Sequence, residues 1–191
     1  MYSDPAFGFS VLCWVVLWVY CLLSARKQKE EKKREPGLER LRQIVPMAAA
    51  YFLLLDPGTG YGGLGARFVP ARGVLQVAGA LLTAAGVALA IRARWHLGEN
   101  WSARVSIRAG HELIRTGPYR SIRHPIYTGM ILATAGTALV IGEVRGLLAL
   151  AITLISFYLK ARKEELWLAE EFPVEFADQA KHTGMFLPRL S

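Results

Sequence analysis

A polar segment runs directly into an apolar stretch at residues 117–129, whose sequence is Gly-Pro-Tyr-Arg-Ser-Ile-Arg-His-Pro-Ile-Tyr-Thr-Gly. This segment holds two arginines, one histidine and two tyrosines. Fixed polar side chains at the mouth of a membrane helix are costly, and they usually have a function. The pattern therefore predicts a cofactor pocket at a membrane surface.

The residue types in this segment suit a ligand with an aromatic or cationic part. Gly117 frees backbone groups for a close approach, and the proline after it fixes a turn. Tyr119 and Tyr127 each offer an aromatic face, which can pack on an adenine or attract a sulfonium through a cation–π contact. The alternative is an interfacial belt that only anchors the chain to lipid headgroups, and we expect Arg120 and Arg123 to act only in this way.

The end of the same segment has the features of a helix start. His124 precedes Pro125, and proline is favoured at the first position of a helix. The backbone N–H groups near Ile126 and Tyr127 then have no partner within the helix and suit a ligand carboxylate. We therefore include His124, Pro125, Ile126 and Tyr127 among the candidate cofactor-binding residues.

A second charged group follows the last apolar stretch. Lys160 and Glu164 are four residues apart and share one face of a helix. Glu164 could hydrogen-bond a ribose or an amino group, while Lys160 or Arg162 could hold an anionic substrate. The alternative is a surface ion pair where the helix leaves the membrane. His96 and His182 stand apart from both groups and are expected at an interface or a surface, and no metal-ligand spacing is present.

The elements that must position these residues are membrane helices. The chain is 53% apolar with a mean hydropathy of +0.28, and its apolar residues come in blocks separated by charged runs. The blocks predict an all-α, polytopic membrane protein with about five transmembrane helices. They cover residues 6–24, 44–55, 74–91, 126–142 and 146–159. The mixed-charge connector at 26–35 is predicted to be helical, and the last two spans are predicted to form a hairpin with almost no loop.

Small residues in the third span, such as Gly79 and Gly86, suit close contact with another helix. We divide the chain into an N-terminal part, residues 1–73, with two helices and the connector, and a core, residues 74–191. The core is expected to form the pocket from the 92–125 segment and the C-terminal helix.

The distribution of basic residues predicts the orientation. Of the 23 Lys and Arg residues, 20 lie in 26–42, 92–123 and 160–191, which fall on one side of the five spans. The positive-inside rule then places the N-terminus outside and the C-terminus and pocket in the cytoplasm. The formal charge of +8 belongs to this anchoring pattern and does not indicate nucleic-acid binding. A Gly-x-Gly-x-x-Gly match within 56–73 follows a membrane span instead of a strand, so it is read as an external loop.

At this point the chain resembles a known family. The residues that carry the resemblance are Leu97-Gly98-Glu99-Asn100-Trp101-Ser102, His111-Glu112-Leu113-Ile114, Gly117-Pro118-Tyr119, Arg123-His124-Pro125-Ile126-Tyr127-Thr128-Gly129 and Glu164-Glu165. They are similar to the isoprenylcysteine carboxyl methyltransferases, within a broader group that includes the phospholipid N-methyltransferases. The resemblance covers roughly residues 74–190.

The resemblance implies an integral-membrane methyltransferase that uses S-adenosylmethionine and a lipophilic or prenylated acceptor from the bilayer. The cofactor would be held on the cytosolic side by His111, Glu112, Leu113, Ile114, Gly117, Tyr119, His124, Pro125, Ile126, Tyr127 and Glu164. One departure concerns the acceptor. Eukaryotic members have an arginine four residues before the glutamate that matches Glu164, and this chain has Lys160 there, without the bidentate fork of arginine.

Three functions remain open at this stage. A carboxylate acceptor needs little acid–base help, whereas a phospholipid amine needs a base, for which Glu164 is the nearby candidate. A membrane reductase would bind NADPH, with the arginines of 92–123 at its 2′-phosphate. A membrane scaffold would bind neither cofactor.

Overall fold

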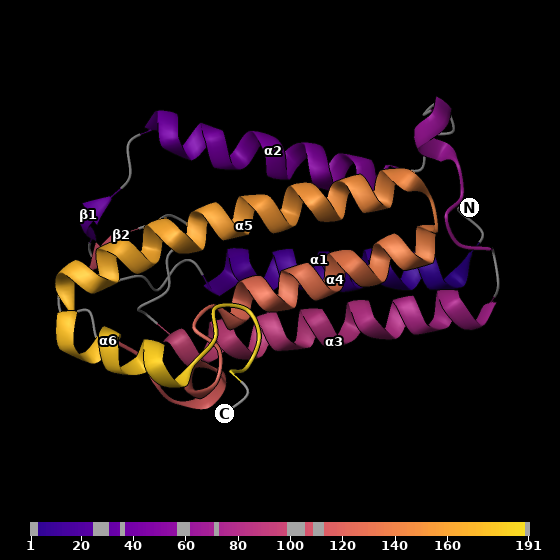
Figure 1. The fold of residues 1–191 in the computed structure, drawn as a ribbon. Helices are drawn as coiled ribbons and strands as arrows, with labels where there is room; N and C mark the ends of the chain where they lie inside the picture. The colour runs from indigo at the N-terminus through magenta and orange to yellow at the C-terminus, as the bar shows by residue number, and fades with distance from the viewer. Residues whose placement is uncertain are drawn as a thin grey trace.

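The computed structural model describes residues 4–24, 31–34, 37–56, 62–70, 73–98, 106–108 and 113–189. Its helices are α1 (Pro5–Ser24), α2 (Gly37–Leu55), α3 (Gly73–Leu97), α4 (Pro125–Ile141), α5 (Val144–Glu171) and α6 (Pro173–His182). The first five lie side by side in one bundle, and α6 turns back across the end where α5 finishes (Figure 1). The predicted all-α class is confirmed.

The helix lengths agree with a polytopic membrane protein. By length and composition, α1, α3 and α5 are long and apolar enough to cross a membrane, and α4 is a shorter apolar helix. The second predicted span, 44–55, forms the C-terminal part of α2, which also includes charged residues in its first turns and Pro46. Each of the five predicted apolar stretches therefore coincides with one of the helices α1 to α5, apart from Gly142, which follows the end of α4.

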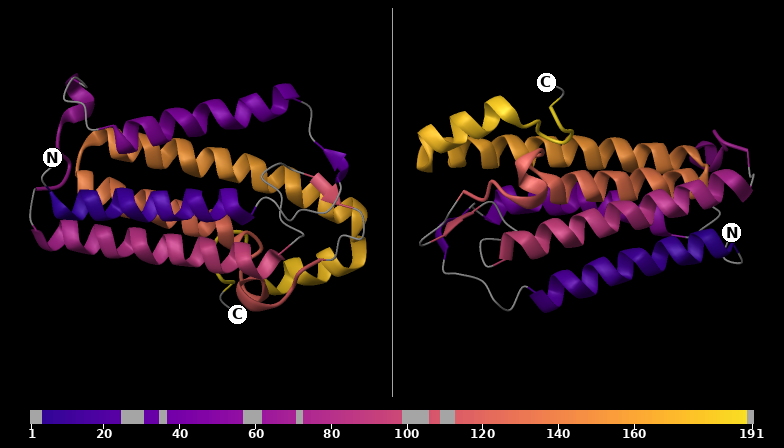
Figure 2. Two further views of the ribbon diagram at one scale, coloured as in Figure 1. Left: turned by 180° about the vertical axis from the view of Figure 1, so that it is seen from behind. Right: turned by 90° about the horizontal axis from the view of Figure 1, so that it is seen from below.

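Helices α3 and α4 pack so closely at their glycines that a side chain at these positions would have no room. A Cβ on Gly86 would lie 2.5 Å from the carbonyl oxygen of Gly129, and a Cβ on Gly136 would lie 2.5 Å from that of Gly79. The small residues of α3 thus allow the close contact that the sequence predicts. Because α3 and α4 are held at this short distance, the start of α4 has a fixed position at the end of the bundle (Figure 2).

The α4–α5 connection is as short as predicted. Gly142 follows α4 in a left-handed conformation with a φ of 66°, which suits glycine, and α5 begins at Val144. Arg145 is fully buried at this turn and binds the carboxylate of Glu143 at 2.7 Å and the carbonyl oxygen of Leu53 at 2.8 Å. It thereby ties the turn to the end of α2.

The described part of the charged connector is not helical, although the sequence predicts a helix at 26–35. Residues Glu31–Arg34 form strand β1, which pairs antiparallel with β2, Ser106–Arg108. A mixed-charge run has no apolar stripe to bury, so helix propensity alone stabilises it weakly. Main-chain pairing with the 106–108 segment is the competing arrangement, and it prevails here. The two strands lie at the same end of the bundle as α6 (Figure 1).

Candidate active site

The turn before α4 is shaped by a glycine that faces a histidine ring. Gly117 begins a 3₁₀ turn, Gly117–Arg120, with a φ of 57°, and a Cβ there would lie within 2.9 Å of three ring atoms of His96. The Nε2 atom of His96 lies 2.8 Å from Oγ1 of Thr116. The prediction that His96 stands apart from the pocket residues is therefore wrong, because the last turn of α3 brings it against this turn.

Tyr119 is buried beneath the same turn. Only 7% of the residue is exposed, and its ring stacks with that of His96 at a centroid distance of 6.4 Å. Its hydroxyl donates a long hydrogen bond, 3.5 Å, to the carbonyl oxygen of Ala93. Burial raises the pKa of Tyr119 above its ordinary value. The residue fixes the turn to α3 and remains an uncharged phenol.

The predicted start of α4 is confirmed, and a C-terminal segment lies beside it. Pro125 is the first residue of the helix, and His124 precedes it. The backbone N–H groups of Arg123 and His124 donate to the carbonyl oxygens of Gly184 and Met185, at 2.9 and 3.1 Å. The chain after α6 therefore forms one wall of the site.

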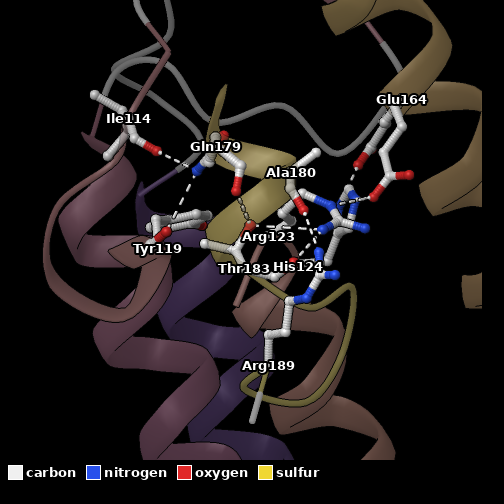
Figure 3. A network of polar contacts seen from close by, with 10 residues as sticks. Ile114, Tyr119, Arg123, His124, Glu164, Gln179, Ala180, Thr183 and Arg189 are labelled. Carbon is white, nitrogen blue, oxygen red and sulfur yellow. Dashed lines mark hydrogen bonds and ion pairs between the residues drawn. The ribbon is translucent and has the colours of Figure 1, made fainter. Parts of the chain in front are cut away.

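A histidine between two carboxylates forms the centre of the site. The Nδ1 atom of His124 lies 3.3 Å from Oε2 of Glu164, and its Nε2 atom lies 3.2 Å from Oε1 of Glu165. Both glutamates come from α5, which stays helical well past the predicted span. We call His124, Glu164, Glu165, Arg123 and Tyr127 the His124 cluster. Figure 3 shows His124 beside Glu164.

The charge of this histidine follows from its neighbours. Burial disfavours the imidazolium, but the hydrogen bonds and negative charges of Glu164 and Glu165 outweigh burial and raise the pKa of His124. With one carboxylate at each ring nitrogen, both nitrogens have an acceptor for a proton. The cluster thus favours the protonated ring.

Arg123 completes the ion-pair network, although the sequence predicts only a membrane anchor. Its Nε donates to Oε1 of Glu165 at 2.7 Å, and the two side chains are only 14% and 12% exposed. Its terminal nitrogen donates to the carbonyl oxygen of Thr183 at 2.5 Å. The anchor interpretation is wrong, because the guanidinium points into the protein and joins α5 to the chain after α6.

Tyr127 holds a carboxylate and does not present a bare ring. Its hydroxyl donates to Oε1 of Glu164 at 2.5 Å. Its ring stacks with His124 at 5.4 Å and with Phe157 at 4.7 Å between centroids. The sequence suggests this ring as a surface for adenine or a sulfonium, but two protein rings already stack on it. The arrangement makes Tyr127 a support for Glu164.

The two predicted substrate-binding cations lie in different surroundings. The Nζ atom of Lys160 lies 5.5 Å from the centroid of the Tyr127 ring, so its charge is beside the His124 cluster. Arg162 is an exposed residue of α5 and lies on another side of that helix.

Of the remaining candidates for cofactor binding, Leu113 and Ile114 lie in the half-buried segment before the turn, and Ile126 lies in the first turn of α4. His111 and Glu112 fall outside the described residues.

Two residues near the site, Gln179 and Thr183, were missed by sequence reasoning, and a third was given no role. Glu165 carries part of the family resemblance together with Glu164, but only Glu164 was included among the candidate site residues. No sequence signal pointed to Gln179 or Thr183, because they lie about 60 residues from their partners and no spacing rule links them. Within the described part of the chain, no group of three or more His, Cys, Asp or Glu side chains could hold a metal ion.

Three curated proteins are similar to part of this chain. The chain is 38% identical over 98 residues to the cobalt-zinc-cadmium resistance protein CzcN of Cupriavidus metallidurans, covering 50% of this chain and 44% of that protein. It is 37% identical over 98 residues to the nickel-cobalt-cadmium resistance protein NccN of Alcaligenes xylosoxydans, covering 50% and 45%. It is 24% identical over 116 residues to protein-S-isoprenylcysteine O-methyltransferase A of Arabidopsis thaliana, covering 60% and 56%.

The chain thus spans about half the length of the curated relatives it matches. A family model covers a larger share of the chain. Residues 74–175, which include all but the first residue of α3, the whole of α4 and α5 and the His124 cluster, match the model of the phospholipid methyltransferases. The sequence therefore identifies this chain as a member of the phospholipid methyltransferase family.

Proposed function

We propose that this chain is an integral-membrane, S-adenosylmethionine-dependent methyltransferase whose acceptor is the carboxylate of an isoprenylcysteine-like lipid. The observation that carries the proposal is the placement of His124 between Glu164 and Glu165, at one end of a membrane bundle and within the segment matched by the family model. The similarity to the Arabidopsis isoprenylcysteine methyltransferase supports the choice of acceptor.

The residues at this end of the bundle fit the chemistry of the cofactor. S-adenosylmethionine, when bound, supplies an electrophilic methyl group on a sulfonium. The carboxylates of Glu164 and Glu165 can accept hydrogen bonds from its ammonium or ribose hydroxyls. The first turn of α4, at Ile126 and Tyr127, has backbone N–H groups without helical partners, which suit its carboxylate.

The cations of the site favour an anionic acceptor. Lys160 is half-buried beside Tyr127, on the helix that carries Glu164. A cation in this position can hold an acceptor carboxylate near the reacting methyl group, and orientation of this kind supplies up to about 7–11 kcal/mol in well-aligned reactions. Methyl transfer to a carboxylate forms an O–C bond, breaks an S–C bond and requires no base. Arg162 is the weaker choice for this role because it is exposed.

The protonation of the site is a reason to rank a phospholipid amine second. An ammonium must lose a proton before it can attack a methyl group. The raised pKa of His124 favours the protonated ring, which cannot accept that proton. Glu164 already accepts hydrogen bonds from Tyr127 and His124. An N-methyltransferase reaction at this site would therefore need a base from elsewhere.

We also propose that the site faces the cytoplasm. The ends of α1 and α3, and the starts of α2 and α4, lie at the same end of the bundle as the His124 cluster (Figure 1). The three segments that hold 20 of the 23 basic residues adjoin these helix ends. The positive-inside rule assigns such an end to the cytoplasm.

Calorimetry on detergent-purified protein tests the cofactor. We expect S-adenosylmethionine to bind with micromolar affinity to the wild type and to Glu175→Gln, a control at an exposed residue of α6. Binding should be lost in Glu164→Ala. Binding of NADPH alone would replace the proposal with a reductase, and binding of neither cofactor would favour a scaffold.

A further inference from the structure

Gln179 on α6 is a buried amide that reaches the turn before α4. Only 5% of the residue is exposed. Its Nε2 atom donates to the carbonyl oxygen of Ile114 at 3.4 Å and to that of Tyr119 at 3.3 Å. An amide NH₂ group has two hydrogens, one for each carbonyl. The amide oxygen could not replace it, because it would face two other acceptors.

The two carbonyls lie on either side of Gly117. Ile114 comes before the turn and Tyr119 lies within it, so one side chain fixes the separation of both parts. Gly117 has a left-handed conformation, and the segment 113–115 has no regular secondary structure. The amide of Gln179 therefore gives both carbonyls a hydrogen-bond donor from a different helix.

The other end of Gln179 leads to the His124 cluster. The main-chain carbonyl oxygen of Gln179 accepts hydrogen bonds from the backbone N–H and the hydroxyl of Thr183, at 3.0 and 2.7 Å. The carbonyl oxygen of Thr183 binds Arg123, which binds Glu165. Figure 3 shows the beginning of this chain of contacts, from Ile114 and Tyr119 through Gln179 to Thr183 and Arg123.

We propose that Gln179 is a positioning residue, which holds the 113–120 segment against the His124 cluster in the shape that binds the cofactor. This inference rests on the proposed function, because it assigns a role in the same site. Gln179 does not touch the groups that react. It acts through the backbone of the segment that includes the predicted cofactor-binding residues Leu113, Ile114, Gly117 and Tyr119.

Two variants separate positioning from general stability. Gln179→Glu replaces the NH₂ group with a carboxylate oxygen, which repels both carbonyls, and Gln179→Leu removes the hydrogen bonds but keeps much of the volume. Glu175→Gln, one turn earlier on α6 and exposed, is the matched control. A buried acceptor without a partner costs about 1–3 kcal/mol, which corresponds to about 5- to 150-fold in an equilibrium.

The experiment measures S-adenosylmethionine affinity and hydrogen–deuterium exchange on the same detergent-purified proteins. We expect at least tenfold weaker binding in Gln179→Glu, a smaller loss in Gln179→Leu and none in Glu175→Gln. Exchange should rise in residues 113–120 and stay unchanged in α3 and α4, whereas a general loss of stability would raise exchange throughout. The KM for S-adenosylmethionine should rise while the KM for the lipid acceptor stays within twofold.

The outcomes distinguish this inference from the function on which it rests. If wild type and Gln179→Glu bind S-adenosylmethionine equally well, the positioning role is wrong and the proposed function stands. If exchange rises throughout the bundle, Gln179 is a stability residue only, and the inference is also wrong. If the wild type does not bind S-adenosylmethionine, the proposed function and this inference both fail.

Discussion

Arg145 and Arg123 lie near opposite ends of the bundle, and the two arginines have different partners. Arg145, at the α4–α5 turn, binds main-chain carbonyls of α2 and one adjacent carboxylate. Arg123, at the other end, binds Glu165, which belongs to a group of ionisable side chains together with Glu164 and His124. The first arrangement satisfies backbone groups and closes a turn. The second brings together more charge than closing a turn requires.

From this difference we infer that the Arg145 end is structural and propose that the His124 end is functional. Buried ion pairs are weak evidence for stability, because the desolvation of both charges offsets their attraction. A cluster that gathers two carboxylates, a histidine whose pKa is raised and a nearby lysine therefore has to be explained by something other than stability. We propose ligand binding as that explanation, and four substitutions compare the two ends.

The largest effect is expected at the structural end. Arg145→Met should lower the free energy of unfolding by about 3–5 kcal/mol, because it leaves Glu143 and two carbonyls without their buried partner. Thermal unfolding in detergent measures this loss, and Arg67→Met, at an exposed side chain, is the control. The folded fraction of Arg145→Met should still bind S-adenosylmethionine with wild-type affinity. A loss of affinity without a loss of stability would reverse the assignment of the two ends.

A smaller effect, on cofactor affinity and not mainly on stability, is expected at the His124 end. Glu164→Gln keeps the size of the side chain but removes its charge, and it should weaken S-adenosylmethionine binding about 100-fold. The reason is that a charged acceptor forms stronger hydrogen bonds than a neutral one. Calorimetry measures the affinity, and the melting temperature should fall by less than in Arg145→Met. Equal affinity in wild type and Glu164→Gln would exclude a direct role for this carboxylate.

The third effect concerns the lipid acceptor. Lys160→Met should raise the KM for an anionic acceptor about tenfold, since a hydrogen bond to a charged group contributes about 1.5–3 kcal/mol. Lys163→Met is a matched control, because Lys163 lies on the same helix but pairs with Glu39 at 3.5 Å. Steady-state kinetics with a prenylcysteine acceptor provide the comparison. Unchanged activity of Lys160→Met on every acceptor would refute its role.

The smallest effect is on the pH dependence of stability. A raised pKa of His124 means that the folded protein holds the proton more tightly than the unfolded chain. The stabilisation is therefore complete below the ordinary histidine value of about 6.5, and it is lost as the pH rises through the higher folded value. His124→Gln should flatten the melting temperature between pH 6 and 9, while Arg145→Met should keep the wild-type slope. An equal slope in His124→Gln would show that another group titrates.

Sequence reasoning predicted the elements better than their partners. Helix starts and ends follow from local patterns, such as Pro125 at the first position of α4 and Gly142 after its last. The positions of His124, Glu164 and Lys160 follow from motif and helical spacing. The use of Arg123 was misjudged because an arginine at a helix mouth usually faces headgroups, and nothing in the local sequence shows that Glu165 will lie beside it.

The C-terminal contacts could not be derived from local patterns. Gln179 and Thr183 meet the site only because α6 folds back across the bundle, and that arrangement depends on the turn at Phe172–Pro173 and on the length of α5. Local sequence patterns also fail to predict which rings pack against Tyr127. An exposed aromatic face was expected, but the stacking partner Phe157 comes from the following helix.

The most direct test of the account is methyl transfer to a lipid by the purified protein in vesicles. The protein is incubated with methyl-labelled S-adenosylmethionine and either a farnesylcysteine acceptor or phosphatidylethanolamine. The account predicts label in the farnesylcysteine product, released as methanol by mild alkali because it is an ester, and much less label after Glu164→Gln at the same cofactor concentration. Alkali-stable label in phosphatidylethanolamine would identify an N-methyltransferase and contradict the carboxylate acceptor. No transfer to either lipid, together with no binding of S-adenosylmethionine, would contradict the methyltransferase assignment itself.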